Sequence, residues 1–274
     1  MTAYADQVAV FRRLHESGCF VMPNPWDVGS ARVLEQLGFP ALASTSAGLA
    51  WSMGRPDIEV TLDQTLVHLA AVVDAVDVPV NADFQGGYAV EPQGVHANVT
   101  LAVATGVAGL SIEDSSDDPA EPLLDIDLAV DRIHAARQAI DESKSGVVLT
   151  GRSEGFVVGR PDIDETLKRL RAYAEAGADC LYAPRVTDVQ HIEAIVAAAA
   201  PKPVNLLINA PFLTVPDVAA LGVRRISVGG TLARTAWAGF LAAAREITEG
   251  GTFTAFQALP DVETLLSPAP EGHA

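Results

Sequence analysis

Four charged residues in this 274-residue sequence have types and positions that could do chemistry. Asp83 and Glu113 each end a short apolar run, and Arg152 and Glu154 follow a third such run. Carboxylates that converge repel one another unless a cation, a shared proton or an arginine compensates their charge. Arg152 is one such partner. A hard divalent ion is the other, because Mg²⁺ takes oxygen ligands and is often held by only one or two carboxylates.

Other polar residues in the sequence are weaker candidates for a functional site. Asp114 and Asp117 are expected to cap helices or to pair locally, and Gly229-Gly230-Thr231 suits an ordinary turn better than a phosphate site. The six histidines all fall in predicted helices or in the tail, so none is a convincing base or metal ligand. The sequence contains no nucleophile elbow, Walker loop, dinucleotide fingerprint or zinc-ligand spacing.

The candidate functional residues must be positioned by the secondary structure around them. Short apolar runs predict strands near 19–23, 41–45, 78–83, 108–112, 147–151, 179–183, 203–208 and 224–228. Longer amphipathic patterns predict helices near 27–38, 61–76, 92–106, 125–143, 162–177, 187–200, 215–222 and 231–248. A strand-helix alternation of this kind indicates right-handed crossovers and a parallel sheet.

Eight such units favour a closed (β/α)8 TIM barrel over an open doubly wound sheet. We expect one domain over residues 1–274, with an opening helix (5–17) below the barrel and a short C-terminal tail. Reactive groups in such barrels lie at the carboxyl ends of the strands. This rule adds three candidate substrate-binding residues, Trp26, Tyr182 and Asn205, to the acids and Arg152.

Composition excludes several classes of protein. Hydrophobic residues make up 49% and charged residues 19%, which is the opposite of a disordered chain. Eighteen basic against 35 acidic residues give a net charge of −17, which argues against a nucleic-acid surface. Cys19 and Cys180 lie far apart in apolar contexts and suit free thiols. With no signal peptide and no membrane span in the pattern, we expect a soluble, cytoplasmic protein.

Several motifs in order resemble the isocitrate lyase/phosphoenolpyruvate mutase superfamily. The resemblance covers roughly residues 15–240 and is carried by NPWDVGSARVLEQLGFPALASTSAGLAWSMGRPD, VPVNADFQGGY, GVAGLSIEDSS, TGRSEG, LKRLRAYAEAGADCLYAP and LGVRRISVGGTLAR. It implies a (β/α)8 barrel whose C-terminal helix can be swapped between subunits of a dimer or tetramer. It also implies Mg²⁺, with Mn²⁺ as the alternative ion. The implied substrate is a small carboxylic acid that gives a 2-oxo acid or enolate when a C–C or C–P bond is cleaved.

The resemblance also implies site residues. The superfamily's substrate-cradling Ser-Gly-Gly falls on Thr45, Ser46 and Ala47, and its loop aspartate falls on Asp57. Its metal motif falls on Asp83 and Gln85, its next acid on Glu113, and its arginine on Arg152. In these roles a metal ion and Arg152 would neutralise a pyruvyl carboxylate and the developing enolate.

Two departures from the pattern narrow the expected chemistry. Gln85 stands where the superfamily has a second metal aspartate, which should weaken metal binding. The lyase branch has a Lys-Cys-Gly-His-type stretch that carries its acid; here the corresponding stretch reads DSSDDPAEPLLDID, without Cys, Lys or His. That disfavours isocitrate and methylisocitrate cleavage, and so acidic a loop is a poor clamp for a phosphonate.

The reaction left best supported is C–C cleavage of a small oxo acid, such as decarboxylation of an oxaloacetate-like substrate, with Tyr182 or water as proton donor. The alternatives are C–P chemistry, or a barrel that has lost metal catalysis and binds a metabolite.

The helix over 231–248 and the turn near 262–266 carry more apolar residues than one barrel flank needs: Leu232, Trp237, Phe240, Leu241, Val262, Leu265 and Leu266. We therefore expect a homodimer or homotetramer.

Overall fold

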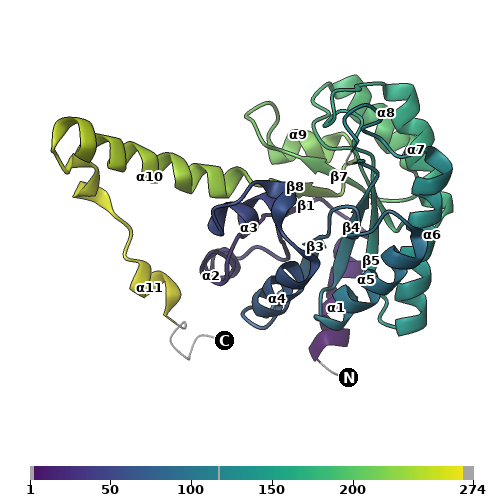
Figure 1. Ribbon diagram of the computed structural model, residues 1–274, viewed down its shortest axis with the longest axis horizontal. Helices are drawn as coiled ribbons and strands as arrows, with labels where there is room; N and C mark the ends of the chain where they lie inside the picture. The colour runs from purple at the N-terminus through teal and green to yellow at the C-terminus, as the bar shows by residue number, and fades with distance from the viewer. Residues whose placement is uncertain (1–2, 117, 268–274) are drawn as a thin grey trace.

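The computed structural model describes residues 3–116 and 118–267, so the expectation for Asp117 lies outside the described residues. Its centre is a sheet of eight parallel strands surrounded by helices (Figure 1). The strands are β1 (Phe20–Met22), β2 (Leu42–Ala43), β3 (Val80–Asp83), β4 (Gly109–Glu113), β5 (Val148–Arg152), β6 (Cys180–Tyr182), β7 (Val204–Leu207) and β8 (Arg225–Ser227).

The strands are paired in the order β1-β8-β7-β6-β5-β4-β3-β2. Between the two ends of this order, the backbone N–H of Ala43 donates to the carbonyl of Pro23 at 3.0 Å, which brings β2 against the end of β1. The predicted (β/α)8 barrel is therefore confirmed as a nearly closed barrel. Because all strands run the same way, their carboxyl ends meet at one rim.

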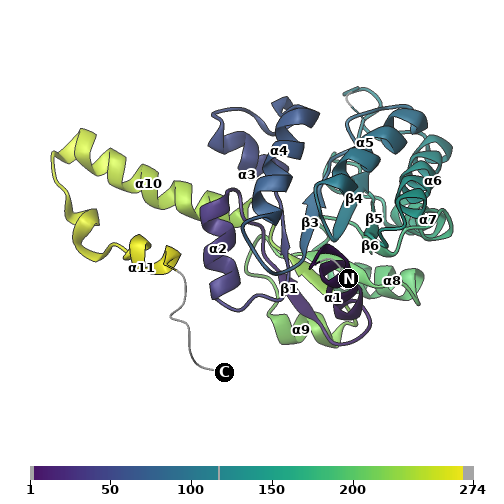
Figure 2. The same ribbon diagram turned by 90° about the horizontal axis from the view of Figure 1, so that it is seen from below.

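Helices follow the strands and form the outer layer of the barrel (Figure 2). They are α1 (Ala3–Leu14), α2 (Val28–Gln36), α3 (Ser46–Ser52), α4 (Leu62–Val73), α5 (Pro92–Ala104), α6 (Ile126–Ser143), α7 (Ile163–Glu175), α8 (Val189–Ala199), α9 (Val215–Ala220), α10 (Thr231–Gly250) and α11 (Val262–Leu266). Two short 3₁₀ helices, η1 (Asp57–Glu59) and η2 (Thr254–Ala258), complete the set.

Helix α1 closes the amino-terminal end of the barrel. Its Phe11 is fully buried, and a Cβ at Gly109 at the start of β4 would lie only 2.5 Å from the Phe11 ring. Arg12 of the same helix donates through Nε to the carbonyl of Gly146, just before β5. Glycine at 109 is therefore required for α1 to pack against the strand ends.

Helix α10 leaves the barrel and extends away from it, and the chain then turns back so that α11 contacts α2 (Figures 1 and 2). Of α10, Ala233 is buried, whereas Trp237 and Phe240 are 42% and 60% exposed. Across residues 3–116 and 118–267, no helix combines the length and apolar character needed to cross a membrane.

Candidate active site

A cavity of about 430 Å³ opens at the rim formed by the carboxyl ends of the strands. Many of the residues singled out in the sequence line it together: Thr45, Ser46, Ala47, Asp57, Asp83, Arg152, Tyr182 and Asn205. They come from five strand ends and the segments after them, so the barrel gathers groups that are far apart in the sequence.

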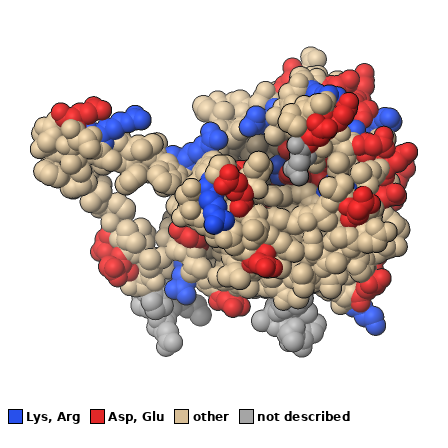
Figure 3. Space-filling model, in the orientation of Figure 1, with Lys and Arg blue, Asp and Glu red and all other residues tan. Residues whose placement is uncertain are grey.

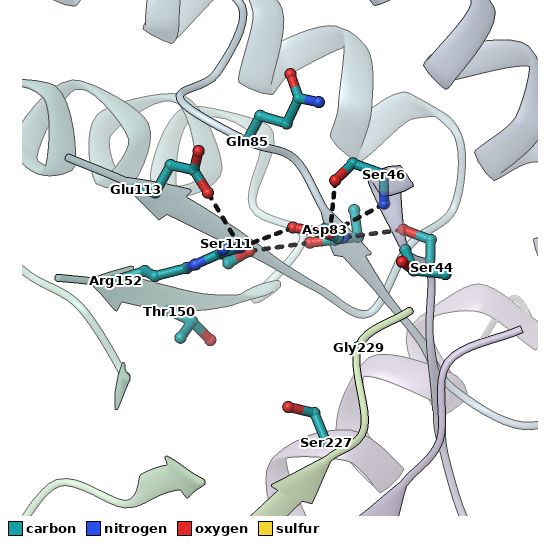
Figure 4. A network of polar contacts seen from close by, with 12 residues as sticks. Ser44, Ser46, Asp83, Gln85, Ser111, Glu113, Thr150, Arg152, Ser227 and Gly229 are labelled. Carbon is teal, nitrogen blue, oxygen red and sulfur yellow. Dashed lines mark hydrogen bonds and ion pairs between the residues drawn. The ribbon is translucent and has the colours of Figure 1, made fainter. Parts of the chain in front are cut away.

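Asp83, the last residue of β3, is held by the start of α3. Its Oδ2 accepts hydrogen bonds from the backbone N–H of Ser46 at 3.0 Å and from the Ser46 hydroxyl at 3.1 Å (Figure 4). The backbone N–H of Asp83 donates to Ser44 Oγ at 2.9 Å, and Thr45 caps α3 by accepting from Gly48. The Thr45 cap therefore starts α3 where its first N–H meets Asp83, a favourable place for a carboxylate.

Arg152, at the end of β5, contacts three carboxylates. Its Nη1 lies 2.9 Å from Asp83 Oδ1 and 3.0 Å from Glu113 Oε2 (Figure 4). Its Nε donates to Glu154. The guanidinium also lies over the Tyr182 ring, with 5.4 Å from Cζ to the ring centroid. Within the described residues no hydrogen bond leaves Nη2, so this nitrogen can bind a ligand.

Negative charge exceeds positive charge in this cluster. Burial raises the pKa of Glu113, with Arg152 opposing the shift and Asp83 reinforcing it. Burial likewise raises the pKa of Asp57, where a hydrogen bond from Ser46 opposes the shift and Asp83 adds to it. Burial lowers the pKa of Arg152, but the surrounding carboxylates outweigh it and hold that pKa well above the ordinary value. The cluster therefore has room for a further proton or cation.

Asp114 has a structural role here, but its partners lie far along the chain, so the expectation that it caps a helix or pairs locally is wrong in this respect. It is 2% exposed and accepts hydrogen bonds from Arg169 Nη1 at 3.1 Å and from the Tyr173 hydroxyl at 2.5 Å. Its other oxygen accepts from the backbone N–H of Glu154 at 2.7 Å. Asp114 thus anchors the segment that carries Glu154 and fixes that carboxylate against Arg152.

Three of the sequence candidates lie differently from the rest. Trp26 is not in the cavity lining but borders a separate hollow with Trp237 and Phe240. Gln85 has φ of +47° and its side-chain Nε2 donates to the carbonyl of Asp57 at 3.3 Å rather than reaching Asp83. Glu113 is not in the cavity lining either, but it contacts Arg152, which is.

Arg225, which the sequence analysis did not single out, lies at the polar floor of the cavity. It is 2% exposed and donates through Nε to Asn205 Oδ1 at 2.8 Å and through Nη2 to Thr150 Oγ1 at 3.1 Å. Its Nη1 lies 3.3 Å from Nε2 of His15, whose pKa burial and Arg225 lower to about 3, so that the imidazole is neutral and can accept. The only signal for it in the sequence was a basic residue within the predicted strand 224–228, which does not show the direction of the side chain.

Comparison with known proteins identifies the family. The model of the phosphoenolpyruvate phosphomutase family matches residues 11–248. The chain belongs to this family. It is thus an enzyme of the isocitrate lyase/phosphoenolpyruvate mutase superfamily, whose members act on C–C or C–P bonds, and the resemblance seen in the sequence is confirmed.

Three family relatives are informative. A crystal structure from Burkholderia cenocepacia J2315 shares 43% identity at a TM-score of 0.94, with 96% of each chain covered. An oxaloacetate decarboxylase of Bradyrhizobium sp. (strain ORS 278) is 32% identical over 72% of this chain and 69% of its own. Oxaloacetate acetylhydrolase, solved with its product oxalate, is 26% identical at a TM-score of 0.84, covering 96% of this chain and 94% of that one.

Glu154 should make the stability of the protein depend on pH. Burial, opposed by Arg152 and reinforced by Glu113, raises the pKa of Glu154 from 4.5 to about 8. Between these values the unfolded chain is ionised and the folded chain protonated, so the free energy of unfolding falls as pH rises. The slope is up to about 1.4 kcal/mol per pH unit for one proton. Glu154→Gln is neutral in both states and should flatten this slope in urea unfolding from pH 5 to 9. Parallel pH profiles for the two proteins would contradict the assignment.

Proposed function

We propose that the protein is a carbon–carbon lyase that cleaves a small 2-oxo or 2-hydroxy carboxylic acid through an enolate, in the manner of an oxaloacetate decarboxylase. The observation that carries this proposal is the placement of Arg152. Its Nη1 lies between Asp83 and Glu113, and its Nη2 is free of hydrogen bonds within the described residues. The names of two relatives, a decarboxylase and a hydrolase of oxaloacetate, support the same substrate class.

A magnesium ion fits the donor set. Asp83 and Glu113 offer carboxylate oxygens beside a single arginine, and burial raises the pKa of Glu113, with Arg152 opposing the shift and Asp83 reinforcing it. In the part of the chain that the structure describes, no three acidic, histidine or cysteine side chains are grouped so that they could hold a metal ion. Asp83 and Glu113 would suit Mg²⁺, or Mn²⁺, as one or two carboxylate ligands with waters completing the shell. When bound, such an ion stabilises the negative charge of an enolate oxygen.

The chain's own groups supply the remaining steps. Arg152 binds the C1 carboxylate of the oxo acid through Nη2, and Ser46 holds Asp83 in place. In oxaloacetate the C3–C4 bond breaks, its electron pair forms the C2=C3 double bond of the enolate, and CO₂ leaves. C3 then takes a proton to give pyruvate. Tyr182 is our candidate donor: burial raises the pKa of its hydroxyl to about 12, so it is protonated at neutral pH.

C–P chemistry is the second candidate, because the matching family model is that of a phosphomutase. A phosphonate carries more charge than a carboxylate and needs basic groups around it. The segment after β4, residues 114–125, contains five acidic residues and no basic one. This composition favours the carboxylate substrate.

The proposal is tested by offering the purified protein oxaloacetate and, separately, phosphonopyruvate with Mg²⁺. We expect pyruvate to form from oxaloacetate well above a protein-free blank, which corrects for spontaneous decarboxylation, and to stop when EDTA removes the metal. Release of inorganic phosphate from phosphonopyruvate without turnover of oxaloacetate would instead identify the C–P alternative. Turnover of neither substrate would overturn the decarboxylase assignment.

We also expect a homodimer or homotetramer in solution. The exposed apolar side chains of α10 and the following segment form a nearly continuous series, since Leu241, Ile247, Phe253 and Phe256 are each at least 38% exposed. Apolar surface of this extent on an isolated chain usually marks an interface, here one between copies of the chain. Light scattering should give a mass at least twice 28.7 kDa at micromolar concentration. A clean species of 28.7 kDa would contradict this.

A further inference from the structure

The charges that line the cavity differ from those of the rest of the chain. Acidic side chains spread over much of the face shown in Figure 3, in keeping with the net charge of −17. The cavity, by contrast, is lined by four arginines, Arg152, Arg185, Arg225 and Arg234, and by two acidic residues, Asp57 and Asp83. An arginine-rich cavity in an acidic protein attracts anions locally, whatever the sign of the net charge.

The four arginines are not equivalent. Arg152 is matched by three carboxylates, and Arg225 donates to neutral groups on the floor. Arg185 and Arg234 are exposed, and within the described residues neither forms an ion pair. These two cations therefore have charge available for a ligand in the cavity.

Arg234 is held in place by an aromatic side chain of the cavity wall. Its guanidinium lies over the Trp51 ring, with Cζ 5.1 Å from the ring centroid. The Trp51 ring in turn packs against Gly230 at the start of α10, where a Cβ would come within 2.9 Å of it. Glycine at 230 thus allows Trp51 to support Arg234. Stacking of this kind leaves the edge of a guanidinium free to donate hydrogen bonds.

Arg185 has an unusual backbone. Its φ is +63°, a left-handed conformation that is uncommon for residues other than glycine, asparagine and aspartate. It follows Pro184, another residue of the cavity lining, and precedes Val186, which is 1% exposed. Backbone strain at a cavity wall is a frequent mark of a functional position.

Among the residues that the structure describes, no other rim segment places a basic residue in the cavity lining, because Arg55 after β2 and Arg160 after β5 lie outside it. Residues 114–125 after β4 and residues 84–91 after β3 contain no lysine, arginine or histidine. An anionic group that extends from the substrate beyond Arg152 can therefore be bound from the β6 and β8–α10 side of the cavity, where Arg185 and Arg234 lie.

We propose that Arg185 and Arg234 form a second anion-binding subsite, which holds an oxyanion group of the substrate other than the carboxylate bound by Arg152. The substrate is then a dianion with a second carboxylate or a phospho group. This inference rests on the proposed function for the nature of the substrate as a small acid, but the subsite is tested by binding alone.

Three stable probes of the same chain length separate the binding of the first carboxylate from the binding of a second carboxylate or of a phosphonate. Butyrate has one carboxylate, succinate replaces the methyl end of butyrate with a second carboxylate, and 3-phosphonopropionate replaces it with a phosphonate. In calorimetric or NMR titrations with Mg²⁺ present, we expect the wild-type protein to bind succinate at least about tenfold more tightly than butyrate. If 3-phosphonopropionate binds more tightly still, the second group is a phospho group; if it does not, the group is a carboxylate.

The variants Arg185→Gln and Arg234→Gln test the residues. Each should weaken succinate binding by about tenfold, the loss of one charge-assisted contact, and change butyrate binding by less than about twofold. Arg245→Gln is the matched control, because Arg245 is exposed on the same helix as Arg234 but lies outside the cavity lining. It should leave both affinities unchanged.

Equal binding of succinate and butyrate by the wild-type protein would overturn the subsite, as would equal losses for both probes in the Arg185 and Arg234 variants. If Arg245→Gln weakened succinate binding as much as Arg234→Gln does, the affinity would depend on the net charge of the protein and not on a local contact. That result would also overturn the subsite. Failure of the proposed reaction gives a different pattern: oxaloacetate is not turned over while the probes are still discriminated. If oxaloacetate is turned over but succinate and butyrate bind equally, only the subsite is overturned and the proposed reaction stands.

Discussion

Arg152→Lys is expected to lower kcat/KM for oxaloacetate by about two to three orders of magnitude, the usual cost of losing a donor to developing negative charge. Arg152 contacts Asp83 and Glu113 through Nη1 and Glu154 through Nε, and its Nη2 is left for substrate. Lysine retains the positive charge among the three carboxylates, so the fold should survive. Its single ammonium cannot replace the planar arrangement of donors that these contacts use.

Arg160→Lys provides the control for this experiment. The Arg160 side chain is 52% exposed and pairs at 4.0 Å with Glu121 on the rim. The same substitution there should leave kcat/KM within about twofold, because exposed ion pairs contribute little. Steady-state kinetics and urea unfolding of both variants separate loss of chemistry from loss of fold. Full activity of Arg152→Lys would show that the donor geometry of Arg152 is not used in the reaction.

The meeting of Asp83, Glu113 and Arg152 could be predicted from sequence because it depends on topology. Each residue ends an apolar strand, and parallel strands of a barrel place their carboxyl ends at one rim. The strand register then brings the three residues next to one another. Glu113 and Arg152 are partners across β4 and β5, and Asp83 of β3 is paired with Ser111, two residues before Glu113. No side-chain detail was needed for that prediction.

Side-chain direction could not be predicted in the same way. Gln85 was expected to face the metal position, but its left-handed backbone directs the amide to the carbonyl of Asp57. Helix α3 was not expected at all, because seven residues are too few to show a helical period; it depends on the Thr45 cap. Asp114 was expected to pair locally, and its partners Arg169 and Tyr173 lie on α7, one strand and one helix further along the chain.

The arginines of the cavity show a further limit of sequence analysis. Arg225 lies in an apolar run, and nothing in the run says that its side chain turns inward to Asn205 and Thr150. Arg234 was one of several polar residues on a helix, and its role in the cavity wall depends on the Trp51 ring, 183 residues earlier in the chain. Contacts between distant segments of this kind require the folded structure.

Gln85→Asp should tighten Mg²⁺ binding by about tenfold. A new carboxylate about 5 Å from a cation gains about 3 kcal/mol at an effective dielectric of about 20, and desolvation and repulsion from the neighbouring carboxylates offset part of this. Aspartate is among the residues that tolerate the left-handed φ of +47° at this position. The new side chain also gives up the hydrogen bond from Gln85 to the Asp57 carbonyl, so the gain comes from its charge near the cation and needs no direct contact with the ion. Calorimetric titration of Mg²⁺ into both proteins measures the change.

Asp83→Asn should abolish Mg²⁺ binding and turnover together. The amide oxygen of asparagine can still accept from the N–H and hydroxyl of Ser46, so the start of α3 should keep its position and the variant should fold. What is lost is the negative charge that pairs with Arg152 and attracts a cation. Asp118→Asn removes an equal charge at an exposed position of the rim and should bind Mg²⁺ as the wild type does. If wild type, Gln85→Asp and Asp83→Asn gave the same isotherm, no cation would be held at the end of β3. Arg152 alone would then have to stabilise the enolate.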